Sequence, residues 1–79
     1  MTQLARLVEV NWKPLERLFS AEECSSFMYM GRAGEIEIYK HRETRHCLNI
    51  DVVSGEFYLY SNGTYRKVSK AAALAFVFG

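Results

Sequence analysis

Alternation of apolar and polar residues with period two governs the middle of this 79-residue chain. It recurs in three runs, at residues 35–41, 46–52 and 56–60. Because successive side chains of a strand point to opposite faces of a sheet, such alternation predicts half-buried strands. The dipeptide Asn62-Gly63 follows the third run and predicts a tight hairpin, since both residues tolerate a positive φ. Residues 64–68 then form the returning strand, so the pattern predicts a four-stranded antiparallel meander.

Helix signals precede the predicted sheet. Pro14 suits the first turn of a helix, where its missing N–H costs nothing, and predicts a short helical segment over 14–19. Ser20 followed three residues later by Glu23 is a capping-box pattern. This pattern predicts a second helix over about 21–30, which two glycines end.

The sequence predicts the secondary structure of the C-terminal end more clearly than that of the N-terminal end. Residues 4–10 fit both a helix turn and a short strand, and both alternatives stay open. At the other end, Ser69 is a suitable cap for a last helix over 70–78. The predicted fold is therefore α+β and a single domain over 1–79. It has an N-terminal helix, a four-stranded antiparallel meander, and a short C-terminal helix packed on one face.

The alternation also assigns each strand residue to one face of the sheet, because a slip of one residue exchanges the faces. Keeping the aliphatic residues together requires an odd-length loop between the first two strands, either Glu43–Arg45 or His41–Arg45. The buried face is then predicted to hold Ile36, Ile38, Leu48, Ile50, Val52, Phe57, Leu59 and Val68. The opposite face is predicted to display Tyr39, His41, Cys47, Asn49, Asp51, Tyr58, Tyr60, Tyr65 and Lys67. In the second hairpin the predicted pairs are Phe57 with Val68, Tyr58 with Lys67, and Tyr60 with Tyr65.

Four tyrosines on one face of so small a sheet suggest a contact surface. Tyrosine joins an apolar ring to a polar tip and is enriched at interfaces, although it is also a good strand former. The C-terminal run 71–78 is apolar nearly all round, which predicts either that the rest of the chain or a second subunit covers it, or that it is a frayed end packed by Leu74, Phe76 or Phe78 alone. We therefore expect a non-catalytic interaction module that binds a protein partner or forms a homo-oligomer. The expected contact residues are Tyr39, Tyr58, Tyr60, Tyr65, Lys67, Phe76 and Phe78.

An alternative function follows from the basic stretch 40–46, in which five of seven residues can carry positive charge. Next to the tyrosines, this stretch could bind single-stranded nucleic acid by stacking and phosphate contacts. The residues for this alternative are the basic Lys40, His41, Arg42 and Arg45, together with the tyrosines Tyr39, Tyr58 and Tyr60. A net charge of +1 and the acidic residues predicted on the same face, Glu37 among them, argue against it.

A catalytic reading is weaker. Cys47 and His41 lie on the same predicted face, and a Cys–His pair can make an activated thiolate. However, a flat sheet of this size offers little pocket. No Cys-x-x-Cys or His-x₃-His spacing indicates a metal site, and His46 is predicted to point to the core. We therefore expect no enzyme activity, no metal and no cofactor.

The cellular location is inferred from what the sequence lacks. No apolar run is long enough to span a bilayer, and Arg6 and Glu9 interrupt the N-terminal apolar stretch, unlike in a signal peptide. Two cysteines, Cys24 and Cys47, are too few for a disulfide-stapled secreted domain. The expectation is a cytoplasmic protein with free thiols and no membrane association.

Overall fold

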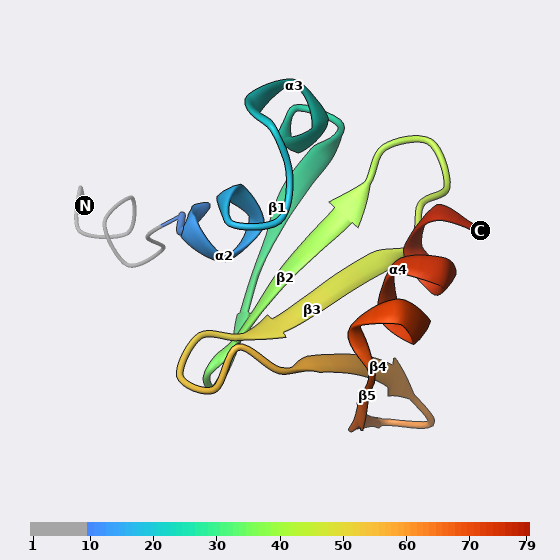
Figure 1. Ribbon diagram of the computed structural model, residues 1–79. Helices are drawn as coiled ribbons and strands as arrows, with labels where there is room; N and C mark the ends of the chain where they lie inside the picture. Colours follow the sequence, from blue (N-terminus) through green and yellow to red (C-terminus); the bar gives the residue numbers. More distant parts are fainter. Residues whose placement is uncertain (1–9) are drawn as a thin grey trace, which may run out of the picture.

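The computed structural model describes residues 10–79, and there it places five strands in one antiparallel sheet (Figure 1). The strands pair in chain order: β1 (Phe27–Ala33), β2 (Ile36–His41), β3 (Cys47–Asp51), β4 (Phe57–Ser61) and β5 (Thr64–Val68). Three helices accompany them in the same part of the chain: α2 (Lys13–Glu16), α3 (Ala21–Cys24) and α4 (Lys70–Phe78). The α+β class and the antiparallel meander are confirmed, whereas the predicted number of strands is wrong.

The additional strand is β1, which replaces the second half of the predicted helix over 21–30. The capping box is present, because Ser20 Oγ accepts from the backbone N–H of Glu23 and the Glu23 carboxylate accepts from the N–H of Ser20. The helix nevertheless ends at Cys24. A capping box specifies where a helix begins and not how far it continues. The residues that follow instead pair with β2 along the edge of the sheet, with a bulge between Tyr29 and Gly31.

The other two helices are closer to prediction. Helix α2 begins one residue before Pro14 and is shorter than the predicted segment over 14–19. Helix α4 covers the predicted range, and Ser69 Oγ accepts from the N–H of Ala72 as its N-cap. The question whether residues 4–10 form a helix or a strand falls on residues 4–9, which lie outside the described part of the chain.

The second hairpin has the predicted register. Asn62 and Gly63 adopt φ values of 52° and 78°, as a two-residue turn between twisted strands requires. The pairs are Phe57 with Val68, Tyr58 with Lys67, and Tyr60 with Tyr65. This agreement shows that the turn residues and the alternation specify the same register.

The register of the first hairpin is opposite to the prediction. Tyr39 pairs with Leu48, and a hydrogen bond from the N–H of His41 to the carbonyl of His46 leaves residues 42–45 as an even-length loop. An even loop exchanges the faces of β2 relative to β3. Tyr39 and His41 therefore point to the core, and the predicted exposure of both is wrong. The isoleucines that were predicted to be buried, Ile36 and Ile38, are half-buried and lie on the opposite face.

Tyr39 is the centre of the core. Its side chain is 0% exposed, and its ring lies 5.6 Å from the ring of Trp12 and 5.9 Å from that of Tyr29. Its hydroxyl donates to the backbone carbonyl of Asn11 at 2.5 Å, so burial leaves no polar atom unpaired. A buried tyrosine removes more apolar area from water than an isoleucine. Asn11 and Trp12 thus supply the acceptor and the ring contact that favour this register.

The rest of the predicted buried face is mostly correct. Leu48, Ile50 and Phe57 belong to the buried core, and Val68 packs at its margin. On the opposite face, which was predicted to be exposed, Asn49 is buried. Its amide nitrogen donates to the carbonyl of Tyr58 at 3.0 Å, which satisfies the group.

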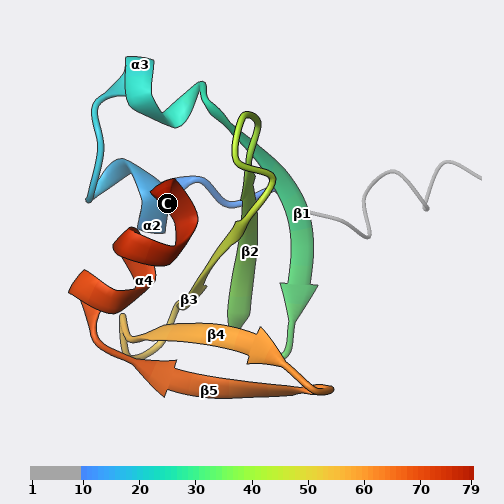
Figure 2. The ribbon, with the colours of Figure 1, turned by 90° about the vertical axis from the view of Figure 1, so that its right-hand side faces the viewer.

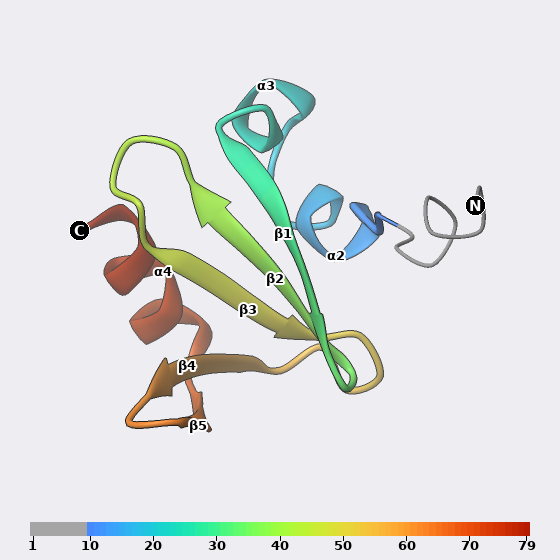
Figure 3. The same cartoon turned by 180° about the vertical axis from the view of Figure 1, so that it is seen from behind.

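All three helices lie on one side of the sheet (Figure 2). Strands β3 and β4 pair over a short stretch, and beyond it the β4–β5 hairpin turns away from the first three strands. Helix α4 lies in the resulting angle and contacts β2, β3 and β4. Seen from behind, no helix of the described residues crosses β1, β2 or β3 (Figure 3). None of the helices within residues 10–79 is long and apolar enough to cross a membrane.

Candidate interaction surface

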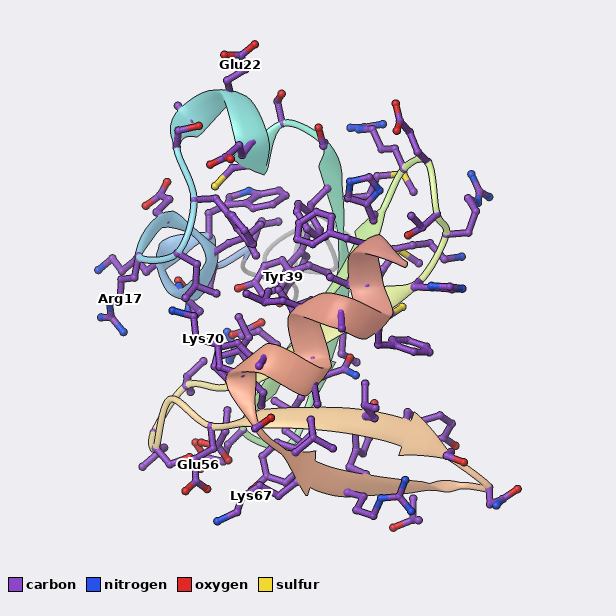
Figure 4. All side chains as sticks on the ribbon, turned by 45° about the vertical axis from the view of Figure 1, so that its right-hand side comes forward. Arg17, Glu22, Tyr39, Glu56, Lys67 and Lys70 are labelled. Atoms are coloured by element: carbon purple, nitrogen blue, oxygen red, sulfur yellow. The ribbon has the colours of Figure 1, made fainter. Side chains whose placement is uncertain are left out.

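Helix α4 presents an apolar surface to solvent (Figure 4). Lys70 is its one residue with a polar side chain, and alanine, leucine, phenylalanine and valine fill the remaining positions. Ala73 and Val77, four residues apart, are fully buried against the sheet. The remaining exposed apolar residues form what we call the α4 surface: Ala71, Ala72, Ala75, Phe76 and Phe78. The two phenylalanines remain 44% and 47% exposed, so the fold of residues 10–79 leaves much of their apolar area in water.

The β2–β3 loop holds the C-terminal end of α4 in place. Thr44 Oγ1 donates to the carbonyl of Val77 at 2.6 Å. His46 Nδ1 lies 2.8 Å from the carbonyl of Phe76, and the imidazole stacks on the Phe76 ring at 4.6 Å. These contacts satisfy carbonyls that a helix end otherwise leaves without partners. Phe76 is therefore presented to solvent from a fixed helix turn.

Three of the four predicted tyrosines share the face of the sheet that no helix of residues 10–79 covers, which we call the helix-free face. Tyr60 and Tyr65 are direct cross-strand partners with ring centroids 4.8 Å apart, and Tyr58 pairs with Lys67 on the same face. Tyr60 is 59% exposed, whereas Tyr58 and Tyr65 are half-buried. Burial, and after it the nearby Tyr60, raises the pKa of Tyr65. With Tyr39 in the core, the tyrosine surface is smaller than predicted and is restricted to the β4–β5 hairpin.

The two surfaces lie on different sides of the sheet. The tyrosines are on the helix-free face, and α4 covers the other face (Figures 2 and 3). Lys67 is ion-paired with Glu56 at 3.3 Å, which neutralises charge beside Tyr58. A single flat partner therefore cannot cover the tyrosine surface and the α4 surface together.

His41 has a structural role in place of the predicted contact with nucleic acid. It is 7% exposed, and its ring packs edge-to-face against Phe27 and Phe78, with ring centroids 5.0 and 5.3 Å apart. Its Nδ1 accepts hydrogen bonds from the backbone N–H groups of Glu43 and Thr44 at 3.2 and 3.3 Å. The imidazole thus shapes the loop from within and is not available to a phosphate.

The basic residues of this hairpin are dispersed. Lys40 is half-buried on the helix-free face, whereas Arg42 and Arg45 are exposed in the loop. Arg42 Nε donates to the carbonyl of Ser25 at 3.1 Å, which ties the loop to the segment before β1. The proposed nucleic-acid surface consequently loses its buried tyrosine and histidine and retains three separated cations.

The structure does not bring together the Cys47–His41 pair that was considered from the sequence. His41 points to the core while Cys47 points to the helix-free face. Burial raises the pKa of the Cys47 thiol. Burial also raises the pKa of Cys24, with further contributions from the nearby carboxylates of Glu16 and Glu23. Both thiols are therefore protonated at neutral pH, and protonated thiols are poor nucleophiles.

A buried carboxylate was not anticipated, because the predicted register placed Glu37 on the exposed face. Glu37 is 0% exposed and accepts from the Tyr29 hydroxyl at 2.6 Å and from Arg32 Nε at 2.7 Å. Arg32 Nη2 completes an ion pair at 2.7 Å. The Arg32 side chain is 45% exposed, so the pair connects the core with solvent. The network fastens β1 to β2 at the edge of the sheet.

A groove between α2, α3 and β1 is the second feature that sequence reasoning missed. Its volume is about 580 Å³. It is lined by Trp12, Glu16, Phe19, Ala21, Cys24, Ser25, Phe27 and Arg42. Seven of these residues lie within the stretch 12–27 and Arg42 lies in the β2–β3 loop, and the groove forms because this stretch ends in strand β1 and not in the predicted helix.

Comparisons with known proteins add no relative to this geometry. No family model matches this chain. Searches of curated proteins and of solved structures also returned no match. In residues 10–79, no three His, Cys, Asp or Glu side chains gather in a way that could hold a metal ion.

Proposed function

We propose that this chain is a small, non-catalytic interaction module of the cytoplasm that self-associates through the α4 surface. The observation that carries the proposal is the exposure of an apolar helix: after Lys70, every exposed side chain of α4 is an alanine or a phenylalanine. A helix without a polar face is normally covered by other structure. Contiguous apolar surface that remains exposed marks an interaction site.

A second copy of the chain suits this surface. Ala71 and Ala75 lie on one side of the helix, four residues apart, and their small side chains permit close approach of another helix. In a two-fold dimer the same patch lies on both sides of the interface. An antiparallel arrangement of the two α4 helices places each Lys70 near the C-terminal carbonyls of the other helix, where a cation is favourable. It also keeps the two lysines apart.

The helix is favoured over the tyrosine surface for two reasons. Tyr58 and Tyr65 are already half-buried by the chain itself, so Tyr60 alone has a large exposed area to lose on binding. Lys67 is ion-paired with Glu56, so binding there would disturb an existing contact. The nucleic-acid alternative is not favoured by a specific observation, because two of its residues, Tyr39 and His41, are in the core.

The proposed location rests on the cysteines. Cys24 and Cys47 are both free thiols. Free thiols persist in a reducing compartment and are oxidised or paired in a secreted one. The cytoplasm is the simplest setting for this chain.

The test is a comparison of two glutamate variants by sedimentation velocity over a wide range of protein concentration. Ala75→Glu places a charge in the middle of the α4 surface, and glutamate is a good helix former. Met30→Glu, at an exposed position on β1 away from α4, is the matched control. We expect the wild type and Met30→Glu to dimerise as concentration rises and Ala75→Glu to remain monomeric. A wild-type chain that is monomeric at every concentration would overturn the proposal.

A further inference from the structure

The groove between α2, α3 and β1 has the size and lining of a small-molecule site. Ligand pockets in proteins typically enclose about 300–1,000 Å³ and combine apolar walls with a few polar groups. The groove measures about 580 Å³. Trp12, Phe19 and Phe27 form its aromatic lining, and the Phe19 and Phe27 rings stack with centroids 5.6 Å apart. Phe27 is almost fully buried, which makes it a rigid part of the lining.

One cation lines this groove without an acidic partner. Two hydrogen bonds fix Arg42: its backbone N–H donates to the carbonyl of Ser26 at 2.9 Å, and its Nε donates to the carbonyl of Ser25 at 3.1 Å. Its guanidinium forms no ion pair with any carboxylate in the part of the chain that the structure describes. The remaining N–H groups of such a guanidinium suit a planar oxyanion, which they can bind in a bidentate manner.

The charges in the groove are unevenly placed. Glu16 also lines it, from α2, whereas Arg42 belongs to the β2–β3 loop on the other side of α3 and β1 (Figure 1). Glu16 is near the thiol of Cys24, since its charge contributes, after burial, to raising the pKa of that thiol. An anion in the groove is therefore attracted to the end at Arg42 and repelled from the end at Glu16.

We propose that this groove binds a small organic anion, an aromatic or aliphatic molecule with one carboxylate. The guanidinium of Arg42 binds the acid group, and the apolar body of the molecule packs against Trp12, Phe19 and Phe27. Aromatic surfaces gain from offset or edge contacts in addition to the area that they bury. None of the lining residues belongs to α4, but Phe78 of the α4 surface packs edge-on against Phe19 and Phe27 at 5.7 and 6.1 Å, so the groove adjoins that surface.

The single tryptophan of the chain makes the test direct, because Trp12 lines the groove and its fluorescence reports occupancy. The probes are 4-phenylbutyrate and its uncharged amide, titrated against the full chain. We expect a saturable change in Trp12 emission with the acid and much weaker binding of the amide. Arg42→Gln is expected to weaken binding of the acid roughly tenfold, as for the loss of a charge-assisted hydrogen bond. Arg45→Gln, in the same loop but outside the groove, is expected to bind as the wild type does.

Thiol protection supplies a second readout that does not depend on fluorescence. Cys24 lies in the groove, whereas Cys47 lies on the helix-free face and serves as an internal reference. Saturating 4-phenylbutyrate is expected to slow alkylation of Cys24 by iodoacetamide and to leave the rate at Cys47 unchanged.

Several results would overturn the inference. They are a Trp12 signal that does not saturate, equal binding of the acid and the amide, and equal affinity of the Arg42→Gln and Arg45→Gln variants. Protection of both cysteines to the same degree would do so as well. A shift of Trp12 emission with protein concentration alone, before any probe is added and in the Ala75→Glu variant as well as in the wild type, would assign the groove to a second copy of the chain.

Discussion

Replacing Tyr39 by phenylalanine tests the inverted register of β2, which determines both the core and the exposed surface. The change removes one oxygen and keeps the ring, so the packing against Trp12 and Tyr29 is preserved. It deletes the hydrogen bond to the carbonyl of Asn11. A typical intramolecular hydrogen bond contributes about 1 kcal/mol net, and an acceptor left unpaired adds to the loss. We therefore expect the free energy of unfolding to fall by about 1–2 kcal/mol.

The matched control is Tyr60→Phe, which makes the same chemical change at a side chain that is 59% exposed. Its hydroxyl is accessible to water, so we expect a change within about 0.5 kcal/mol. Urea unfolding followed by far-UV circular dichroism and by Trp12 fluorescence gives both values. With an m-value of about 1 kcal/mol/M, Tyr39→Phe should lower the midpoint by roughly 1 M or more. Equal midpoints for the two variants would refute the buried position of Tyr39.

Three further outcomes follow from the same contacts. Burial raises the pKa of Tyr39 above its ordinary value of 10.0. The stabilisation that its neutral hydroxyl contributes is therefore fully present below that pH and is lost as the pH rises further. Urea midpoints measured against pH should fall above about pH 10, and should fall less steeply in Tyr39→Phe. Glu37→Gln should lower the free energy of unfolding by about 2 kcal/mol, because it breaks a buried network of charge-assisted hydrogen bonds. Glu56→Gln, at an exposed ion pair, should lower it by less than about 0.5 kcal/mol in the same urea assay. A larger loss for Glu56→Gln than for Glu37→Gln would contradict the burial of Glu37. Cys24 and Cys47 should both react with iodoacetamide at neutral pH more slowly than free cysteine, since burial raises both pKa values, and a faster rate at either would contradict that direction.

The elements that the sequence predicted well are those with local causes. The turn at Asn62-Gly63 needs positive φ at both positions, and this requirement together with alternation gives the register of the β4–β5 hairpin. Helix α4 begins at its Ser69 cap because the side-chain acceptor and the alanines after it lie within a few residues of each other. Such features do not depend on distant parts of the chain, so a single sequence suffices for them.

The face of β2 has a distant cause and could not be read locally. Both faces of this strand offer apolar side chains, two isoleucines on one and Tyr39 on the other, so alternation permits either register. The choice depends on Asn11 and Trp12, which are far away in sequence and supply the acceptor and the ring contact for Tyr39. The same distance explains why the buried carboxylate of Glu37 was missed.

The sequence did not predict strand β1 or the groove, for a related reason. The run from Phe27 onwards fits a helix stripe and a strand face equally well over so few residues. Pairing with β2 favours the strand over the helix, and this pairing cannot be inferred from the residues of β1 alone. The groove then depends on β1 being a strand, because Phe27 at its start completes the aromatic lining with Trp12 and Phe19.

Isotope-filtered nuclear Overhauser spectroscopy on a mixed sample of labelled and unlabelled chains tests the self-association most directly. It detects contacts between copies and excludes those within one copy. The α4 surface should give intermolecular signals between the methyl groups of Ala71 and Ala75 and the ring of Phe76 in the other copy. Signals that involve Tyr60 or Tyr65 instead, or no intermolecular signal at concentrations where the sample is dimeric, would contradict the assignment to α4.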